Sequence, residues 1–290
     1  MVIDTLCLSG GGIYGFNLIG CLKYLDESKI IILNKIKKIV GTSVGSLLGL
    51  LLIINYDINS IIKILYKLNF ENIDLEYDID NFIENYGFNN CSEILTIIQS
   101  LFFNKLNVYD LTFMELYKKT GKDFNVIVVN LTKKQEELLN YKNNPEMSVI
   151  LALRMSISIP LMFYPVKYNN NLYIDGSVMN NFGFNYCDSK KTIGICVLTN
   201  LKDNPKNILE YVKHIYVILI NNLSKKHLEN PKCENILYLK NKDQSMMNFD
   251  KNIKFELIKN GYKQTKKKRR INFIALKVIN NIFSNIFKVN

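Results

Sequence analysis

The stretch "KIKKIVGTSVGSLLGLLLII", residues 35–54, has the pattern of a strand, a tight turn and a central helix. Residues 35–43 favour a buried strand that runs into a turn, and residues 44–54 favour a helix that is apolar on nearly all sides. A helix without a polar face is buried, so we expect this one near the centre of the fold. Its longest apolar run, residues 47–54, is far too short to cross a bilayer.

A similar unit precedes this stretch in the chain. Residues 4–9, "DTLCLS", favour a short buried strand that ends in a glycine turn, and residues 13–28 favour a helix. Because strand, turn and helix occur twice in this order, we expect parallel strands joined by right-handed crossovers. The remaining pattern predicts strands at 123–131, 192–198 and 234–239, and a turn, a short strand and a loop within 169–177. It predicts helices at 92–103, 145–160 and 206–222.

Composition limits the class of protein. The chain has 290 residues and a formal net charge of +11, densest in "KQTKKKRR" at 263–270, which favours an acidic partner such as an anionic membrane or nucleic acid. Six scattered cysteines form no C-x-x-C pair, which favours reduced thiols in the cytoplasm over disulfides or a zinc site. Residues 1–9 lack a basic segment typical of a secretory signal. We expect no metal and no cofactor.

The glycine run "SGGGIYG" at 9–15 contains the spacing of Gly10, Gly12 and Gly15 that occurs in dinucleotide-binding loops. That fold also needs an acidic residue at the end of the second strand to bind the ribose. Here the second strand ends in "IVGTSVG", which has no acid, and no G-K-[ST] follows the glycines as a phosphate loop requires. The sequence therefore disfavours nucleotide binding.

"GTSVG" at 41–45 matches the G-x-S-x-G nucleophile elbow, in which a serine lies on a sharp turn from strand to helix. Ser43 would then need a base. The chain has two histidines: His214 lies in an apolar helical pattern and His227 in a polar stretch, so neither has the loop position typical of a triad histidine. The other candidate is Asp175 in "YIDGS", at a predicted strand end, although Asp-Gly is also a common turn.

Together, "SGGGIYG" at 9–15, "GTSVG" at 41–45 and "DGS" at 175–177 resemble the three motifs of the patatin-like phospholipases, in the same order and with similar spacing. The segment "RMSISIPLMFYPV" at 154–166 also resembles the one that precedes the family's aspartate, and the resemblance covers about residues 4–200. It implies a three-layer α/β/α sandwich with a mostly parallel central sheet. Two residues depart from the pattern: Tyr14 replaces a frequent Arg or Lys, and Ser177 replaces Gly or Ala.

The resemblance also implies a lipid acyl hydrolase that acts through an acyl-enzyme, and because no metal-ligand residues cluster in the sequence, we expect hydrolysis to be independent of calcium. Ser43 would be the nucleophile and Asp175 the proton acceptor, without a histidine. The backbone N–H groups of Gly11 and Gly12, with Gly10 as a third, would form the oxyanion hole. The supporting glycines of the three motifs are Gly15, Gly41, Gly45 and Gly176.

Other functions and partners stay open at this point. A conventional Ser–Asp–His esterase using His214 or His227 is one alternative, and a non-catalytic protein that binds lipid or nucleic acid is another. The pattern divides the chain into a patatin-like domain at 1–240 and a basic, amphipathic tail at 241–290. Residues 263–290 would suit an anionic membrane surface, and nucleic acid is the less favoured partner. We therefore expect a cytoplasmic protein, with peripheral membrane contact as an open option.

Overall fold

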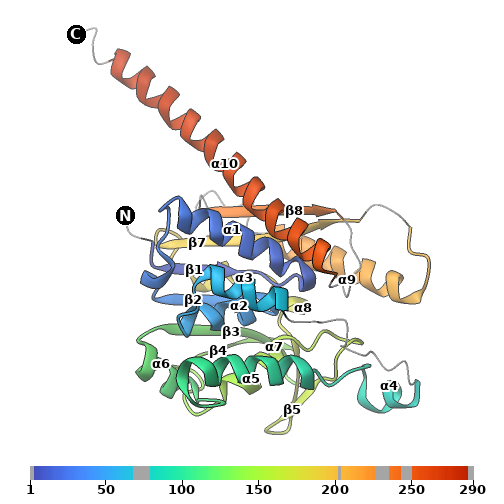
Figure 1. Ribbon diagram of the computed structural model, residues 1–290. Coiled ribbons are helices and arrows are strands. Elements are labelled where there is room, and N and C mark those ends of the chain that lie inside the picture. The colour runs from blue at the N-terminus through green and yellow to red at the C-terminus, as the bar shows by residue number, and fades with distance from the viewer. Residues whose placement is uncertain (1–2, 68–78, 202–203, 226–234, 243–249, 287–290) are drawn as a thin grey trace.

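The computed structural model describes residues 3–67, 79–201, 204–225, 235–242 and 250–286, and from residue 269 onward only the backbone (Figure 1). Within these ranges eight strands form one sheet, in the order β5-β6-β3-β2-β1-β7-β8 with β4 paired to β3. The strands are β1 (Thr5–Leu8), β2 (Lys38–Thr42), β3 (Asp123–Asn130), β4 (Gln135–Leu139), β5 (Val166–Tyr168), β6 (Asn171–Asp175), β7 (Thr192–Asn200) and β8 (Ile236–Lys242).

The centre of the sheet is parallel, as the two strand–turn–helix units predict. β1 pairs in parallel with both β2 and β7, and the outer pairs β2–β3 and β7–β8 are parallel too. The antiparallel part lies at one side, where β4 and β6 pair with β3 and β5 pairs with β6. The sequence analysis did not predict β4 or β5.

Helices flank this sheet. Those of the first half are α1 (Gly15–Glu27), α2 (Val44–Ile53), α3 (Ile58–Lys67), α4 (Ile79–Asn85), α5 (Ser92–Leu106) and α6 (Phe113–Thr120). Those of the second half are α7 (Val149–Ser156), α8 (Ser177–Asn180), α9 (Ile208–Lys225) and α10 (Lys251–Ile286). The mixed α/β fold with a mostly parallel central sheet is therefore confirmed.

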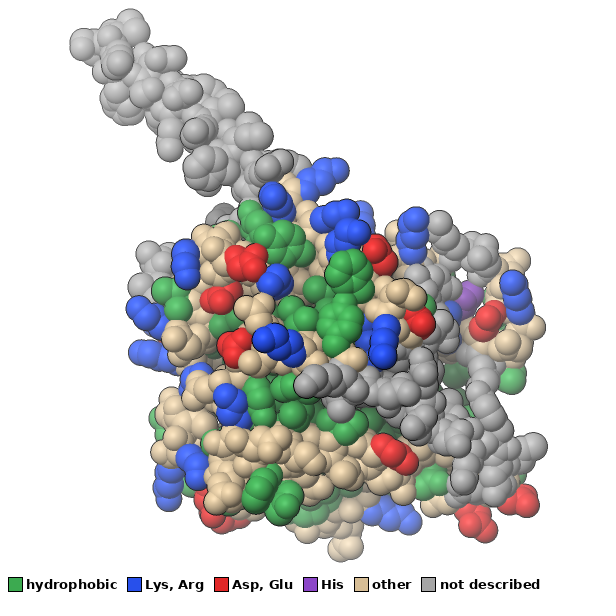
Figure 2. All heavy atoms as spheres, viewed as in Figure 1, with side chains coloured by type: hydrophobic (Ala, Val, Ile, Leu, Met, Phe, Trp, Pro, Cys, Tyr) green, Lys and Arg blue, Asp and Glu red, His purple; other side chains and the backbone are tan. Residues whose placement is uncertain are grey.

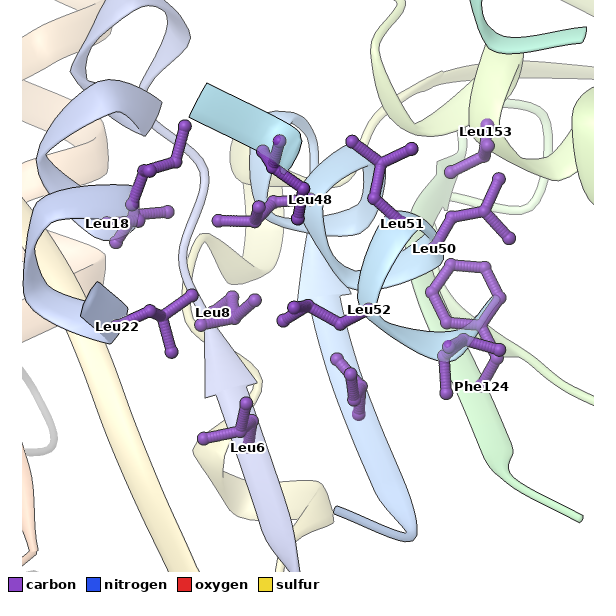
Figure 3. Close-up of a cluster of buried hydrophobic side chains, with 14 of the residues drawn as sticks. Leu6, Leu8, Leu18, Leu22, Leu48, Leu50, Leu51, Leu52, Phe124 and Leu153 are labelled. Carbon is purple, nitrogen blue, oxygen red and sulfur yellow. The ribbon is translucent and has the colours of Figure 1, made fainter. Parts of the chain in front are cut away.

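The larger core lies between the sheet and the helices α1 and α2. Figure 3 shows leucines of both helices pointing toward one another, toward β1 and toward Phe124 of β3. α2 is buried on nearly all sides, as its composition predicts. A smaller cluster covers the opposite face of the sheet, where Phe182 and Phe184 pack on Cys7, Val40 and Ile127. Alternate residues of each strand thus face different cores.

Two predicted segments, residues 92–103 and the start of the tail, pack against the body of the fold. Residues 92–103 lie in α5, whose Ile98, Leu101 and Phe102 are buried in the main core, so this segment is a packed helix. α10 crosses α1 at very short range: a Cβ built on Gly20 would lie 1.9 Å from the carbonyl oxygen of Ile258. The first part of α10 is therefore part of the packed body, and its far end projects away from it (Figure 1).

Candidate active site

Register in the sheet determines where the predicted motifs meet. Thr42, the last residue of β2, pairs with Ile127 of β3, and Asp175, the last residue of β6, pairs with the next residue, Val128. β4 occupies the other edge of β3 along this stretch, so β2 and β6 share one edge and end head to head. The residue that follows Thr42 is Ser43. The two strand ends therefore place Ser43 and Asp175 side by side.

Ser43 lies in the sharp turn that its motif predicts. Its backbone has φ 51° and ψ −127°, a conformation that residues other than glycine rarely adopt. Ser43 directly precedes α2. A Cβ built on Gly45 would lie 2.4 Å from the carbonyl oxygen of Leu8, so the turn packs directly against the end of β1. Only 4% of Ser43 is exposed. The turn thus holds the hydroxyl at the N-terminus of a buried helix, where the helix dipole favours negative charge.

Ser156, at the end of α7, holds this turn in place through two hydrogen bonds. Its hydroxyl accepts a hydrogen bond from the backbone N–H of Ser43 at 2.9 Å and donates one to the carbonyl oxygen of Ile127 at 2.8 Å. Ser156 is completely buried. The hydroxyl therefore connects the turn to β3 at the place where β2 ends and β6 begins to pair. Sequence reasoning did not single out Ser156, although it quoted the segment that contains it.

Asp175 is completely buried at the end of β6. One carboxylate oxygen, Oδ1, accepts a hydrogen bond from the backbone N–H of Ser177 at 2.7 Å. The other, Oδ2, has no hydrogen-bond partner of ordinary geometry among the described residues. Burial raises the pKa of Asp175 to about 6, and the nearby hydroxyl of Ser43 is the strongest influence that opposes this rise. The free oxygen is thus an acceptor without a donor, beside a serine.

The glycine loop lies against the same serine. A Cβ built on Gly10 would stand 3.2 Å from the Cβ of Ser43 and 2.5 Å from Oδ1 of Asn181. The N–H of Gly10 is donated to the backbone carbonyl of Asn181 at 3.1 Å. In the described part of the chain the N–H groups of Gly11 and Gly12 have no partner, and both glycines have positive φ angles, 151° and 54°. Two backbone donors are therefore unused in the loop whose Gly10 contacts Ser43.

The supporting glycines mark other close approaches. A Cβ built on Gly15 would lie 2.4 Å from Cγ2 of Val44, and one built on Gly176 would lie 2.4 Å from the carbonyl oxygen of Ile127. A Cβ on Gly41 would lie 2.6 Å from the Cα of Ser46. Each of the three motifs therefore packs on backbone or side chains next to the turn at Ser43.

α9 forms one wall beside the glycine loop. The side-chain amide of Asn181 donates to the hydroxyl of Ser224 on α9 at 2.9 Å. A narrow pocket of about 20 Å³ is lined by Gly11, Tyr14, Val197, Thr199, Val217, Ile220 and Asn221. Tyr14, a departure from the family pattern, is buried and donates its hydroxyl to the carbonyl of Lys242 at 3.1 Å.

The two histidines have different positions. His214 lies on α9 and is partly exposed, whereas Val217, Ile220 and Ser224 form the buried side of this helix. His227 lies outside the described residues.

No group of three or more His, Cys, Asp or Glu side chains within the described ranges is arranged to hold a metal ion. In the same ranges, none of the helices is long and apolar enough to span a membrane.

A buried serine turn, an acid at a neighbouring strand end and a glycine loop therefore lie together in this mixed α/β fold. The family model for patatin-like phospholipases matches residues 6–188, more than half of the chain. The chain therefore belongs to the patatin-like phospholipase family, which confirms the resemblance found in the sequence.

Relatives and solved structures agree with this assignment. The chain is 35% identical over 230 residues to the "Probable lipid hydrolase 463L" of Invertebrate iridescent virus 6, covering 75% of this chain and 78% of that protein. It is 28% identical over 270 residues to the uncharacterized protein R571 of Acanthamoeba polyphaga mimivirus, covering 87% and 88%.

Two solved structures share the fold. VipD from Legionella pneumophila superposes with a TM-score of 0.57 at 16% identity, and the type III effector ExoU with 0.53 at 13% identity. These matches cover 92% and 91% of this chain, but the chain spans only 66% of VipD and 52% of ExoU.

Proposed function

We propose that the protein hydrolyses the acyl esters of phospholipids or related lipids, with Ser43 as nucleophile and Asp175 as its base. The main observation behind this proposal is the pairing register along β3: the last residues of β2 and β6 pair with adjacent residues of β3. Membership in the family and the lipid hydrolase among the relatives support the substrate class.

The first half of the reaction forms an acyl-enzyme. Oγ of Ser43 attacks the ester carbonyl carbon while its proton passes to Oδ2 of Asp175, which has no other partner among the described residues. The carbonyl oxygen becomes negative and accepts hydrogen bonds from the N–H groups of Gly11 and Gly12. The C–O bond then breaks, and the leaving alcohol oxygen takes the proton from Asp175.

The second half reverses these roles with water. Asp175 accepts a proton from a water molecule while the water oxygen attacks the acyl carbonyl carbon. The same glycine donors stabilise the new oxyanion. The bond to Oγ of Ser43 breaks, Oγ takes the proton back, and the fatty acid leaves. Each preorganised donor of this kind contributes about 3 kcal/mol to lowering the barrier.

The environment of the carboxyl group suits this role. A free aspartate is a weak base, but burial raises the pKa of Asp175 to about 6 and so increases its affinity for the serine proton. Proton transfer is concerted with attack, because a carboxylate cannot fully deprotonate a free hydroxyl. We leave Gly10 out of the donor set, because its N–H is already donated to Asn181.

The test is a panel of phospholipid and neutral lipid esters, assayed with the wild type, Ser43→Ala and Asp175→Asn. We expect both variants to lose hydrolysis by about three orders of magnitude or more. A fluorophosphonate probe should label the wild type at Ser43. Labelling without hydrolysis of any ester in the panel would contradict the proposed substrate class.

Two further experiments separate the alternatives. A His214→Ala/His227→Ala double variant should keep full activity, and its inactivation would favour a histidine-containing triad. Failure of the wild type to react with the fluorophosphonate probe, together with binding to lipid or nucleic acid, would favour a non-catalytic binding protein. Activity should persist in excess chelator if the reaction is independent of calcium.

A further inference from the structure

α9 exposes a stripe of large apolar side chains. Ile215, Ile218 and Leu219 are 44%, 52% and 52% exposed, and Tyr211 and Ile208 extend the stripe toward the start of the helix with 53% and 70%. At 100° per residue, these five positions fall within an arc of roughly 100°, which is one face of the helix. A continuous apolar face on a surface helix indicates an interaction site.

The opposite side of α9 belongs to the candidate active site. Val217 and Ile220 are buried and line the narrow pocket together with Gly11 of the glycine loop. Ser224, completely buried, accepts the hydrogen bond from Asn181. Because a helix with its side chains is about 10–12 Å across, the exposed stripe lies about one helix diameter from the proposed oxyanion donors.

Charge at the two ends of the helix favours an anionic partner. Lys206 lies two residues before the start of α9, Lys225 ends the helix, and both residues are exposed. Glu210 is the one acidic residue within the helix, and the whole chain carries a formal charge of +11. Figure 2 shows basic side chains (blue) at the right-hand edge of the molecule, where Figure 1 places α9, together with an acidic side chain (red) and a histidine (purple).

We propose that the exposed face of α9, defined by Ile208, Tyr211, Ile215, Ile218 and Leu219, docks on an anionic lipid bilayer. The apolar side chains enter the boundary between head groups and acyl chains, while Lys206 and Lys225 contact lipid phosphates. This inference rests on the proposed lipid substrate. Ser43 is only 4% exposed, so a membrane-held ester must be brought close to it. α9 would do this, because the helix that touches the membrane also lines the pocket beside Gly11 of the glycine loop.

The experiment measures binding separately from catalysis. Full-length Ser43→Ala is floated with vesicles of phosphatidylcholine alone or of phosphatidylcholine mixed with phosphatidylglycerol, whose negative surface potential attracts basic side chains. We expect binding to the anionic vesicles. Adding Ile215→Ser, Ile218→Ser and Leu219→Ser should weaken that binding at least tenfold. Because Ser43→Ala is used throughout, this result does not depend on the proposed chemistry.

A matched control uses apolar residues of similar exposure elsewhere. Ile32 and Leu131 are 42% and 46% exposed and lie away from α9, in the turns before β2 and after β3. Ile32→Ser with Leu131→Ser should leave vesicle binding unchanged. In the active background, the triple α9 variant should hydrolyse a soluble short-chain ester at the wild-type rate but vesicle lipid at least tenfold more slowly, and its thermal unfolding should match that of the wild type.

Other outcomes would overturn the inference. If the triple variant binds vesicles as Ser43→Ala does, α9 is not the docking face. If deletion of residues 269–290 abolishes binding while the triple variant retains it, the tail is the membrane contact. If sedimentation shows that the wild type is a dimer and the triple variant a monomer with unchanged vesicle binding, the stripe is an interface between two copies. Equal loss of activity on soluble ester and on vesicles would show a structural defect in the site.

Discussion

Thr42 and Asp175 end their strands at adjacent positions along one edge of β3, opposite Ile127 and Val128. β2 and β6 run antiparallel to one another, so their last residues approach from opposite directions. The residue after Thr42 therefore lies beside the last residue of β6. Residues 132 positions apart in the chain, Ser43 and Asp175, thereby become neighbours without a dedicated loop. The pairing of β3 is the physical basis of the candidate site.

The strained backbone at Ser43 has a measurable cost. Its φ of 51° with ψ of −127° is a conformation that glycine adopts more readily than other residues. The free energy of unfolding of Ser43→Gly should therefore exceed that of Ser43→Ala by roughly 1 kcal/mol. Both variants should lack hydrolytic activity. Chemical denaturation of the two variants measures the difference. Equal stabilities would show that the turn relaxes when the hydroxyl is removed.

The buried Asp175 links activity to pH. With a pKa of about 6, the carboxyl group should lose its proton as pH rises through 6, so kcat/KM for a soluble ester should rise through the same range. The reason is that only the carboxylate accepts the serine proton. Initial rates between pH 4.5 and 8.5 test this expectation. A flat profile across pH 5–7 would contradict it.

The same group should destabilise the fold at neutral pH. Below about pH 4 the Asp175 carboxyl is protonated in both the folded and the unfolded chain. Above pH 6 it is ionised in both, and in the folded chain this charge is buried. Because the folded pKa is raised above 3.8, stability falls as pH increases through this window, by up to about 3 kcal/mol. Asp175→Asn should therefore be more stable than the wild type at pH 8, and the two should converge near pH 4. Thermal unfolding at both pH values measures this change.

Ser156 should be a positioning residue. Ser156→Ala leaves both the N–H of Ser43 and the carbonyl of Ile127 without its hydroxyl, so we expect a loss of about 1–3 kcal/mol in unfolding free energy and at least a tenfold fall in kcat. KM should change less, because Ser156 lies behind the turn. Thr265→Ala removes another completely buried hydroxyl, on α10, and should leave kcat unchanged. If kcat of Ser156→Ala equals that of the wild type, the bridge is only structural.

The proposed oxyanion donors can be tested at Gly11. Its φ is 151°, and a Cβ there would lie 2.4 Å from Cγ2 of Val197, so Gly11→Ala should displace the loop and lower kcat by about 10²-fold or more. Gly121 is the matched control: its φ is 67°, and a Cβ there would meet nothing within 4 Å. Gly121→Ala should destabilise the fold by about 1 kcal/mol without a change in kcat. Similar kinetics of the two variants would exclude a donor role for this part of the loop.

The sequence predicted the parts of the fold that local pattern determines. The two βα units and the all-apolar α2 follow from hydrophobic periodicity and glycine turns, and the structure confirms them. β4 and β5 were missed because "QEELL" has little apolar pattern and "VKY" is only three residues long. The pairing of β6 with β3 is a long-range property of register, and neither strand's own sequence specifies it.

The candidate site was predictable only through its motifs. An Asp-Gly pair such as Asp175 and Gly176 is an ordinary turn in isolation, and its neighbour Ser43 is set by the sheet. Likewise, no local signal shows that the backbone carbonyl of Asn181 accepts the N–H of Gly10, or that Ser156 connects the turn at Ser43 to β3. The separate status of the tail at 241–290 stays a prediction, although Leu257 and Ile258 within it pack in the main core.

The head-to-head ending of β2 and β6 has a consequence for biosynthesis. On the proposed mechanism, a nascent or misfolded chain has no proton acceptor for Ser43 until residues 171–175 dock on β3. Lipid cleavage would then begin only when the sheet is complete, so an immature copy is harmless to the membranes of the cell that makes it.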